Sequence, residues 1–275
     1  MKIKFLGTAA YDAVPSPFCR CKTCLESRAL GGRNLRTRSQ ALINDDLLMD
    51  FNPDTISHFL RYGIDTEKIN TCLITHSHCD HLYPDDILIP MYGTDPHRVD
   101  YYAGEAGVTE IQNCIRRANT PILEEGKLGL ELAVPFRPFE ADGYRILPLE
   151  ANHNDGTSPM IYAIEKDGKK MLYGLDSGLF PQETVDALAD NGHLDLAVMD
   201  CTGGTQTKGW KINHMALYTV RQTIDLLRQK GVVDDRTVVV LNHFSHNGGA
   251  TYDQMVETAR ADGFLVAYDG MELTV

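Results

Sequence analysis

An apolar run that ends in a dense group of metal-ligating side chains constrains this chain more than any other stretch. Residues 71–81 read TCLITHSHCDH. The apolar half predicts a buried strand of a parallel sheet, and the polar half predicts the loop at its carboxyl end, where open α/β sheets carry ligand sites. In an extended loop His76 and His78 point the same way, and Asp80 with His81 points to a neighbouring spot. One loop therefore offers ligand pairs to two adjacent points, which suits a two-metal site.

The spacing His-x-His-x-Asp-His, formed by His76, His78, Asp80 and His81, resembles the signature of the metallo-β-lactamase fold. This resemblance implies an α/β chain folded as an αββα sandwich of two βα halves, with the metal site at the edge between the sheets. A length of 275 residues suits one such hydrolase domain over residues 1–275. The alternative is a solvated His-rich loop, but the motif stands in the context it requires, a strand followed by a loop.

A strand followed by a polar ligand recurs along the chain. The positions are Asp50, residues 76–81, His153, Asp176, Asp200 and His243. Because the carboxyl ends of parallel strands meet at one edge of a sheet, we expect these side chains to converge. Asp50 ends a predicted hairpin over residues 39–50, where similar proteins place a buried carboxylate that supports the metal loop. The alternative for Asp50 is the N-cap of the next helix, predicted over residues 54–62.

The middle of the chain is the hardest to read. Residues 85–92 and 105–119 favour helices, and we expect the region 82–127 to line the substrate pocket. A second hairpin is predicted over residues 160–175, because Asp167-Gly168 is a favoured two-residue turn.

The resemblance to the metallo-β-lactamase fold implies a ligand set for two divalent cations. The first ion would be held by His76, His78 and His153, and the second by Asp80, His81 and His243. Asp176 would bridge them, since a carboxylate has two oxygens. Spacing alone supplies only the four motif residues, and His153 could instead be an exposed loop histidine. The mixed nitrogen and oxygen set suits zinc, manganese or iron. Cys79, which should point away from its neighbours, is interpreted as a small packed residue.

A second metal site is predicted near the N-terminus. Cys19, Cys21 and Cys24 form a Cys-x-Cys-x-x-Cys motif, which is one ligand short of a closed tetrahedral zinc site. His246 follows His243 by three residues, so it can point away from the catalytic centre toward this loop. A structural Cys₃His zinc site would then fasten the N-terminal loop to the C-terminal half. The alternative is three free surface thiols.

The three motifs together resemble one family, the phosphoribosyl 1,2-cyclic phosphate phosphodiesterases of the carbon–phosphorus lyase pathway. The resemblance implies hydrolysis of a small, cyclic phosphodiester by a hydroxide that bridges two zinc or manganese ions. It also implies a homodimer. The chain departs from the family after the first strand, where residues 7–10 lack the usual extra glycine, and at Phe51-Asn52, where Ala-Gly is usual. These departures leave the natural substrate open.

His214 is the candidate general acid for the leaving group, and Asp80 joins it in the catalytic set as a metal ligand. We predict a helix from an Asn213 cap to Lys230, so that His214 stands at the helix start, where free N–H groups favour a phosphate. The helix dipole would lower the pKa of His214. Asp200 could orient the imidazole. The alternative is a histidine with a purely structural hydrogen bond.

Charge and cysteine content narrow the partners and the compartment. A formal net charge of -12 argues against a nucleic-acid backbone as the main partner, so we expect a small-molecule phosphodiester. Seven cysteines, an odd number, without a secretory segment favour reduced thiols and a cytoplasmic location. An uninterrupted apolar run of about 18 residues, which a membrane span would need, does not occur.

Three other functions compete with the phosphodiesterase. A tRNA 3′-end endonuclease of the same fold is disfavoured by the acidic balance and the lack of a basic arm. A thioesterase or lactonase shares the histidine motif but has no obvious need for the cysteine site. A non-enzymatic, zinc-stapled binding module would not need seven ligands, because structural zinc sites normally close with four.

Overall fold

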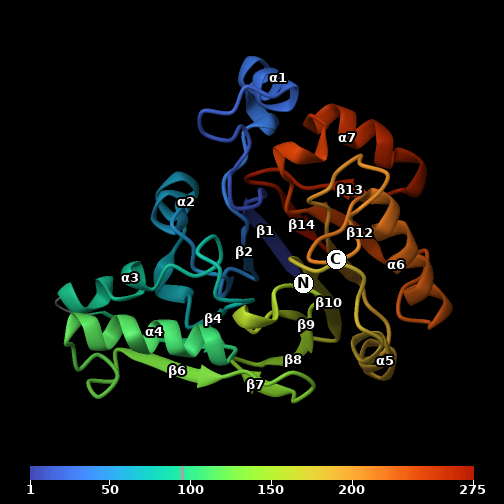
Figure 1. Cartoon of the computed structure of the whole chain (residues 1–275). Helices are drawn as coiled ribbons and strands as arrows, with labels where there is room; N and C mark the ends of the chain where they lie inside the picture. Colours follow the sequence, from blue (N-terminus) through green and yellow to red (C-terminus); the bar gives the residue numbers. More distant parts are fainter. Residues whose placement is uncertain (94–95) are drawn as a thin grey trace.

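Two seven-stranded sheets pack face to face between two layers of helices (Figure 1). The computed structural model describes residues 1–93 and 96–275. The helices are α1 (Lys22–Leu30), α2 (Thr55–Tyr62), α3 (Pro84–Ile87), α4 (Glu105–Ala118), α5 (Gln182–Asn191), α6 (Leu217–Gln229) and α7 (Tyr252–Ala259). In Figure 1, α2, α3 and α4 lie on one side of the sheets and α5, α6 and α7 on the other, while α1 extends away from both. This is the predicted αββα sandwich.

Each half of the chain contributes most of one sheet, and each sheet contains a run of parallel strands. The first sheet has the order β14 (Glu272–Thr274), β1 (Lys2–Gly7), β2 (Gln40–Ile43), β3 (Leu47–Met49), β4 (Thr71–Leu73), β5 (Val99–Ala103) and β6 (Leu128–Leu132). The second has the order β13 (Leu265–Val266), β12 (Val238–Asn242), β11 (Leu196–Asp200), β10 (Lys169–Gly174), β9 (Met160–Lys166), β8 (Tyr144–Glu150) and β7 (Phe139–Ala141). Strands β3 to β6 and β10 to β13 are parallel, so their carboxyl ends share an edge.

The strand that precedes the histidine motif is buried on both faces. Leu73 packs between the two sheets, and its neighbours Cys72 and Ile74 pack in the cluster under α4. Alternate side chains of a strand point to opposite faces, so a strand covered on both sides needs the continuous apolar run seen in the sequence. The same packing fixes the direction in which the following loop leaves the sheet.

Most predicted elements are present. Both hairpins form, and Asp167 and Gly168 have the positive φ values of 52° and 71° that a tight two-residue turn requires. The helix predicted over residues 85–92 is only partly correct, since α3 ends at Ile87 and a 3₁₀ turn covers Ile89–Tyr92. Thr94 and Asp95, within the region 82–127, lie outside the described residues.

The predicted start of the helix after residue 213 is wrong. The helix α6 begins at Leu217, three residues beyond His214. Two side chains hold the preceding backbone away from the helix: the Met215 N–H donates to Asp200 Oδ1 at 2.9 Å, and the Ala216 N–H donates to Thr219 Oγ1 at 2.9 Å. His214 therefore lies in a loop fastened to the end of β11.

Within the described ranges, no helix combines the length and the apolar character needed to cross a membrane.

Candidate metal centre

Three imidazoles converge at the end of β4. His78 Nδ1 lies 2.9 Å from His76 Nε2 and 3.1 Å from His153 Nε2, so these three nitrogens surround one point. His153 comes from the loop after β8, about 75 residues away in the chain, and its other ring nitrogen lies 3.0 Å from the Asn213 carbonyl. This is the group predicted for the first ion.

A second group meets beside the first. Its members are Asp80 and His81 from the motif loop, together with His243 from the end of β12. His81 Nε2 lies 3.4 Å from Asp80 Oδ2. The four motif residues thus divide between two points, as the loop geometry predicts.

Asp176 lies between the two groups. Its Oδ2 is 2.9 Å from both His81 Nε2 and His243 Nε2, and its Oδ1 is 3.8 Å from His153 Nε2. One carboxylate oxygen therefore faces each group. Asp176 therefore lies where a bridging carboxylate would have to lie, and its bridging role stays a prediction.

The donor set fits a bound cation. Among the described residues, His81 Nε2, His243 Nε2 and Asp176 Oδ2 are buried and have no hydrogen-bond partner, although each nitrogen lies close to the oxygen. Buried polar atoms are nearly always satisfied, so three such atoms that converge need an explanation. In their neutral, metal-binding form the two imidazoles would turn lone pairs toward those of the carboxylate and repel them, and a divalent cation between the three atoms would remove that repulsion.

Asp50 supports the metal loop rather than capping a helix. It is fully buried, and its Oδ1 accepts hydrogen bonds from the Thr75 N–H at 2.8 Å and the Thr75 hydroxyl at 2.9 Å. Its Oδ2 lies 2.8 Å from His81 Nδ1. A proton on Nδ1 directs the lone pair of Nε2 toward the second group, which is the usual task of a carboxylate behind a metal-ligating histidine.

Burial and nearby carboxylates shift the histidine pKa values in opposite directions. Burial is the main cause that lowers the pKa of both His76 and His153, which favours the neutral imidazole that binds metals. Burial also opposes protonation of His81 and His243, but Asp176 and the other carboxylates outweigh it. They raise the pKa of His243 to about 10. The second group is therefore the more negative of the two and attracts positive charge.

His214 completes one side of the centre. Its Nδ1 lies 3.1 Å from Asp200 Oδ2 and 3.7 Å from Asp176 Oδ1, so Asp200 holds the imidazole as predicted. The predicted lowering of its pKa is wrong. Burial does lower it, but Asp200 and Asp176 outweigh burial and raise the pKa, and His214 is not at a helix end.

A cavity of about 360 Å³ opens beside these residues. Tyr11 and Cys79 form part of its wall, together with five of the seven predicted ligands and His214. The interpretation of Cys79 as a packed residue is wrong: it is an exposed thiol, because the loop turns outward between His78 and Asp80. The sequence carries no signal that would place Tyr11 here.

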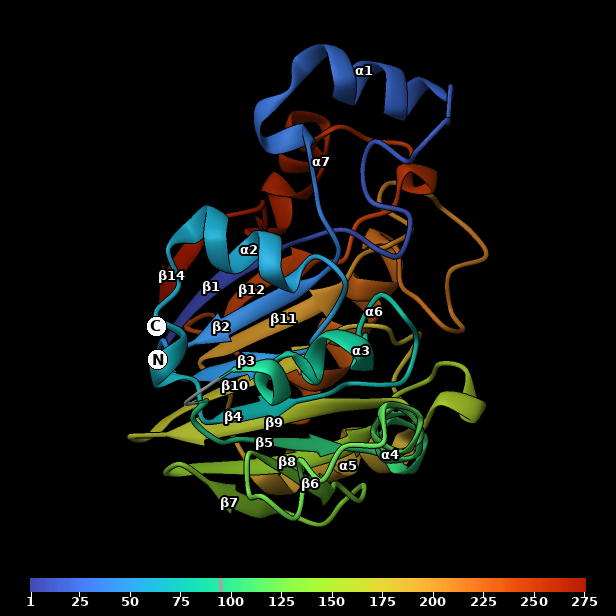
Figure 2. The same cartoon turned by 90° about the vertical axis from the view of Figure 1, so that its left-hand side faces the viewer.

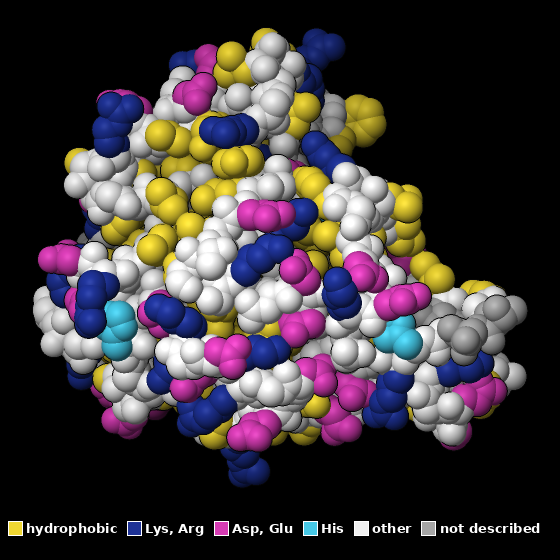
Figure 3. Space-filling view, turned by 180° about the vertical axis from the view of Figure 1, so that it is seen from behind, with side chains coloured by type: hydrophobic (Ala, Val, Ile, Leu, Met, Phe, Trp, Pro, Cys, Tyr) yellow, Lys and Arg dark blue, Asp and Glu magenta, His cyan; other side chains and the backbone are white. Residues whose placement is uncertain are grey.

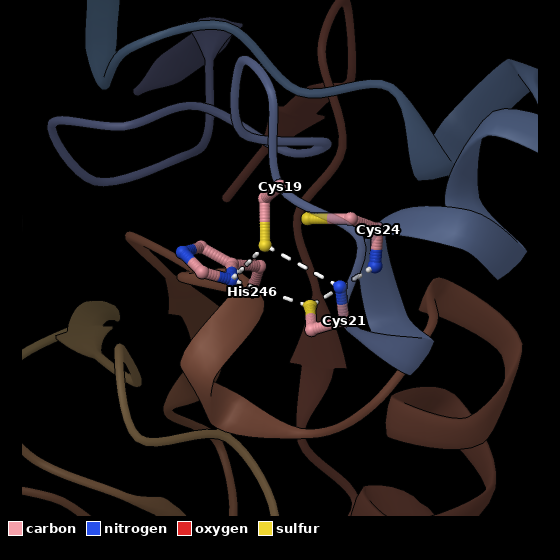
Figure 4. A group of neighbouring side chains, drawn as sticks. All are labelled: Cys19, Cys21, Cys24 and His246. Atoms are coloured by element: carbon pink, nitrogen blue, oxygen red, sulfur yellow. Dashed lines mark hydrogen bonds between the residues drawn. The ribbon is translucent and has the colours of Figure 1, made fainter.

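The predicted N-terminal group also forms. Figure 4 shows Cys19, Cys21, Cys24 and His246 turned toward one another, and their ligand atoms all lie within 4.8 Å. His246 Nδ1 is 3.6 Å from Cys19 Sγ and 3.4 Å from Cys21 Sγ. Its other nitrogen lies 2.5 Å from Asp12 Oδ2.

Neighbouring backbone and side-chain groups hold these four side chains in place. The sulfur atoms accept backbone N–H groups: Cys21 to Cys19 Sγ, Cys24 to Cys21 Sγ, and Ser16 to Cys24 Sγ. The carboxylate of Asp12, which the sequence reasoning missed, fixes the ring of His246 in the way expected behind a metal-ligating histidine.

The sandwich and its edge site together define the metallo-β-lactamase fold class. Residues 47–244 match the model of the β-lactamase superfamily domain, and the chain belongs to this superfamily. Divalent-metal binding and hydrolase chemistry are expected for this class.

Three relatives show how broad the likeness is. Coenzyme PQQ synthesis protein B from Ruegeria pomeroyi is 25% identical over 304 residues and is covered completely, as is this chain. A diphosphatase from the PhnP family has a similar structure, with a TM-score of 0.73 and 21% identity over 100% of this chain and 97% of the other. Zn²⁺-bound PqqB from Methylobacterium extorquens also gives a TM-score of 0.73, with 17% identity and full coverage of both chains. The two structures share the fold with this chain.

Proposed function

We propose that this protein is a metal-dependent phosphodiesterase that hydrolyses a small, cyclic phosphodiester. The observation that carries the proposal is Asp176, whose two oxygens face two separate groups of ligands. His76, His78 and His153 would hold one divalent ion, zinc or manganese, and Asp80, His81 and His243 the other. Two such ions supply a nucleophile derived from water and neutralise the phosphoryl oxygens.

The chain's own residues would orient the substrate and manage the leaving group. The Nδ1 of His214 is occupied by Asp200, which leaves Nε2 as the ring atom able to give a proton to a departing alkoxide. The raised pKa of His214 favours the protonated form that an acid needs.

The size and charge of the site favour a small substrate. The cavity of about 360 Å³ is near the lower end of small-molecule sites. On the face seen in Figure 3, lysine and arginine side chains are interspersed with aspartate and glutamate rather than gathered into a stripe. The small cavity and the formal net charge of -12 both disfavour an RNA partner, which requires an extended basic surface.

We propose that Cys19, Cys21, Cys24 and His246 hold a structural zinc ion, because four suitable ligand atoms meet at one point. The homodimer is part of the same proposal and rests on the resemblance to the cyclic phosphate phosphodiesterases. The cytoplasmic location, also proposed, rests on the seven cysteines without a secretory segment.

The first test is hydrolysis of bis-p-nitrophenyl phosphate by metal-stripped protein with zinc or manganese restored. We expect turnover that depends on the metal. It should disappear in His78→Ala, because the first ion loses one of its three histidine ligands. No turnover by protein with both sites filled would sink the proposal and direct the tests to thioesters and lactones. It would also favour a second candidate, a role in making coenzyme PQQ, which the relatives named for that synthesis support.

The proposed acid has its own test. His214→Asn should lower kcat for a diester with an alkyl leaving group by roughly 10²- to 10⁴-fold, the usual contribution of a general acid. The same variant should hydrolyse bis-p-nitrophenyl phosphate almost normally, because p-nitrophenolate leaves without a proton. Equal losses on both substrates would assign His214 a structural role.

A further inference from the structure

A second cavity opens at the same edge of the sandwich as the metal centre. Its volume is about 510 Å³, which is larger than the cavity beside the metal ligands. Its walls come from the ends of β5, β6 and β8, the start of β9 and the first turn of α4. Figure 2 shows α4 nearly end-on beside the end of β5. None of the seven candidate metal ligands lines this cavity.

The loop between β8 and β9 separates the two cavities. Ala151 and Ser158 face the second cavity, while His153 between them faces the metal centre. The Ser158 hydroxyl accepts the Ala106 N–H of α4 at 3.1 Å. Gly104 packs so closely on this loop that a Cβ atom there would lie 2.7 Å from the Ser158 Cβ. The partition is therefore held tightly against α4, and the cavity is a formed space.

The lining combines an apolar floor with negative charge. The apolar part consists of Gly104, Leu132, Ala133, Val134, Pro135, Ala151, Pro159 and Met160. The charged groups that line it are all carboxylates, those of Glu105, Glu150 and Asp155. Among the described residues, none of the three forms an ion pair, so their charge is not neutralised from within the chain. The N-terminal turn of α4 partly offsets the charge of Glu105, which leaves Glu150 and Asp155 as the main negative groups.

We propose that this cavity binds an organic cation with an apolar body, such as a substituted ammonium ion. The floor would bury the hydrocarbon, and the rim carboxylates would face the cationic head. An anionic ligand does not fit, since three carboxylates would repel it. The site is thus separate in chemistry from a phosphodiester centre, and its existence does not depend on the proposed hydrolysis.

Titration calorimetry of the metal-loaded protein with benzyltrimethylammonium tests this inference. We expect saturable binding, and at least tenfold weaker binding in the double variant Glu150→Gln, Asp155→Asn, whose exposed side chains can change without disturbing the core. The matched control Glu131→Gln, an exposed carboxylate on β6 outside the lining, should bind like the wild type.

Two further probes separate charge from simple hydrophobic binding. Benzyl alcohol, which lacks the charge, and phenylacetate, which reverses it, should each bind at least tenfold more weakly than the ammonium ion. The inference fails if the ammonium ion does not bind, if the three probes bind alike, or if the double variant binds as tightly as the control.

Discussion

Replacing Asp50 with asparagine should weaken metal binding by the second group of ligands, Asp80, His81 and His243, and leave binding by the first group unchanged. The Asp50 carboxylate accepts hydrogen bonds from three groups, two on Thr75 and one on His81 Nδ1, with distances between 2.8 and 2.9 Å. Asparagine has one oxygen and one NH₂ group, so it cannot accept on both sides. If the oxygen stays with Thr75, the NH₂ faces His81 Nδ1 and forces the ring proton onto Nε2, the atom that faces Asp176. If the amide flips, the NH₂ meets the Thr75 N–H instead.

The magnitude follows from the role of such supporting groups. Loss of a partner behind a metal-ligating histidine costs roughly 10- to 100-fold in metal affinity, or about 1.4 to 2.7 kcal/mol at 1.36 kcal/mol per tenfold change. Besides the structural zinc ion, chelator competition should therefore find one equivalent bound as in the wild type and one weakened by this factor. Asp45→Asn, at a half-exposed carboxylate that pairs with Lys2, is the matched control and should leave the affinity for both ions unchanged. Three equivalents in all, the structural ion included, bound with wild-type affinity by a folded Asp50→Asn protein would refute the reasoning.

Two other predictions concern sites outside the catalytic centre. Cys21→Ser should lower the zinc content by about one ion per chain, because a four-ligand site loses a thiolate. The control Cys79→Ser, at an exposed cysteine outside that group, should keep this ion. Elemental analysis of the purified proteins measures the difference, and equal zinc contents would contradict the structural site. Burial lowers the pKa of His58 to about 4, so between pH 6.5 and 4 the unfolded chain binds more protons, and the stability present above pH 6.5 is lost as the pH falls. From pH 7 to pH 5 the loss in the free energy of unfolding amounts to about 2 kcal/mol. In urea unfolding, the free energy of unfolding of His58→Asn should depend on pH less than that of the wild type, by this amount. Identical pH dependences of the two proteins would refute the prediction.

The strand-and-loop signals of the sequence placed the candidate ligands at strand ends, while the resemblance of the histidine motif to a known fold supplied the sandwich and the division of the ligands between two ions. A buried parallel strand needs an unbroken apolar run, and the run before His76 therefore reports both the strand and the edge at which the histidines emerge. Asp176 and His243 each follow such a strand, so the pattern placed them together before the sheet order was known. Their separation along the chain did not matter, because parallel strands align their carboxyl ends.

What the sequence could not give depends on contacts between distant loops. Asp12 supports His246, yet nothing in its neighbourhood distinguishes it from a surface carboxylate. The Thr202 hydroxyl lies within hydrogen-bond distance of His243 Nδ1, at 2.8 Å. Its position there follows only from the packing of β11 against β12. The error about His214 has the same origin, since periodicity marks the helix but not the side chain of Asp200 that holds the preceding backbone outside it.

The backbone at the centre shows why these ligands sit where strands end. Asp50, Asp176 and His243 have φ values of 66°, 50° and 63°, in the left-handed region that residues with a side chain seldom adopt. Each follows a strand closely, and the turn there swings its side chain out of the sheet's alternation and toward the edge. Such a conformation costs roughly 1 kcal/mol or more per residue, and glycine would avoid the cost but has no side chain to offer. Backbone strain at these three positions is therefore the cost of placing a ligand, or the carboxylate that supports one, at the edge of the sheet. The well-packed strands before them are rigid enough to hold the strained conformation.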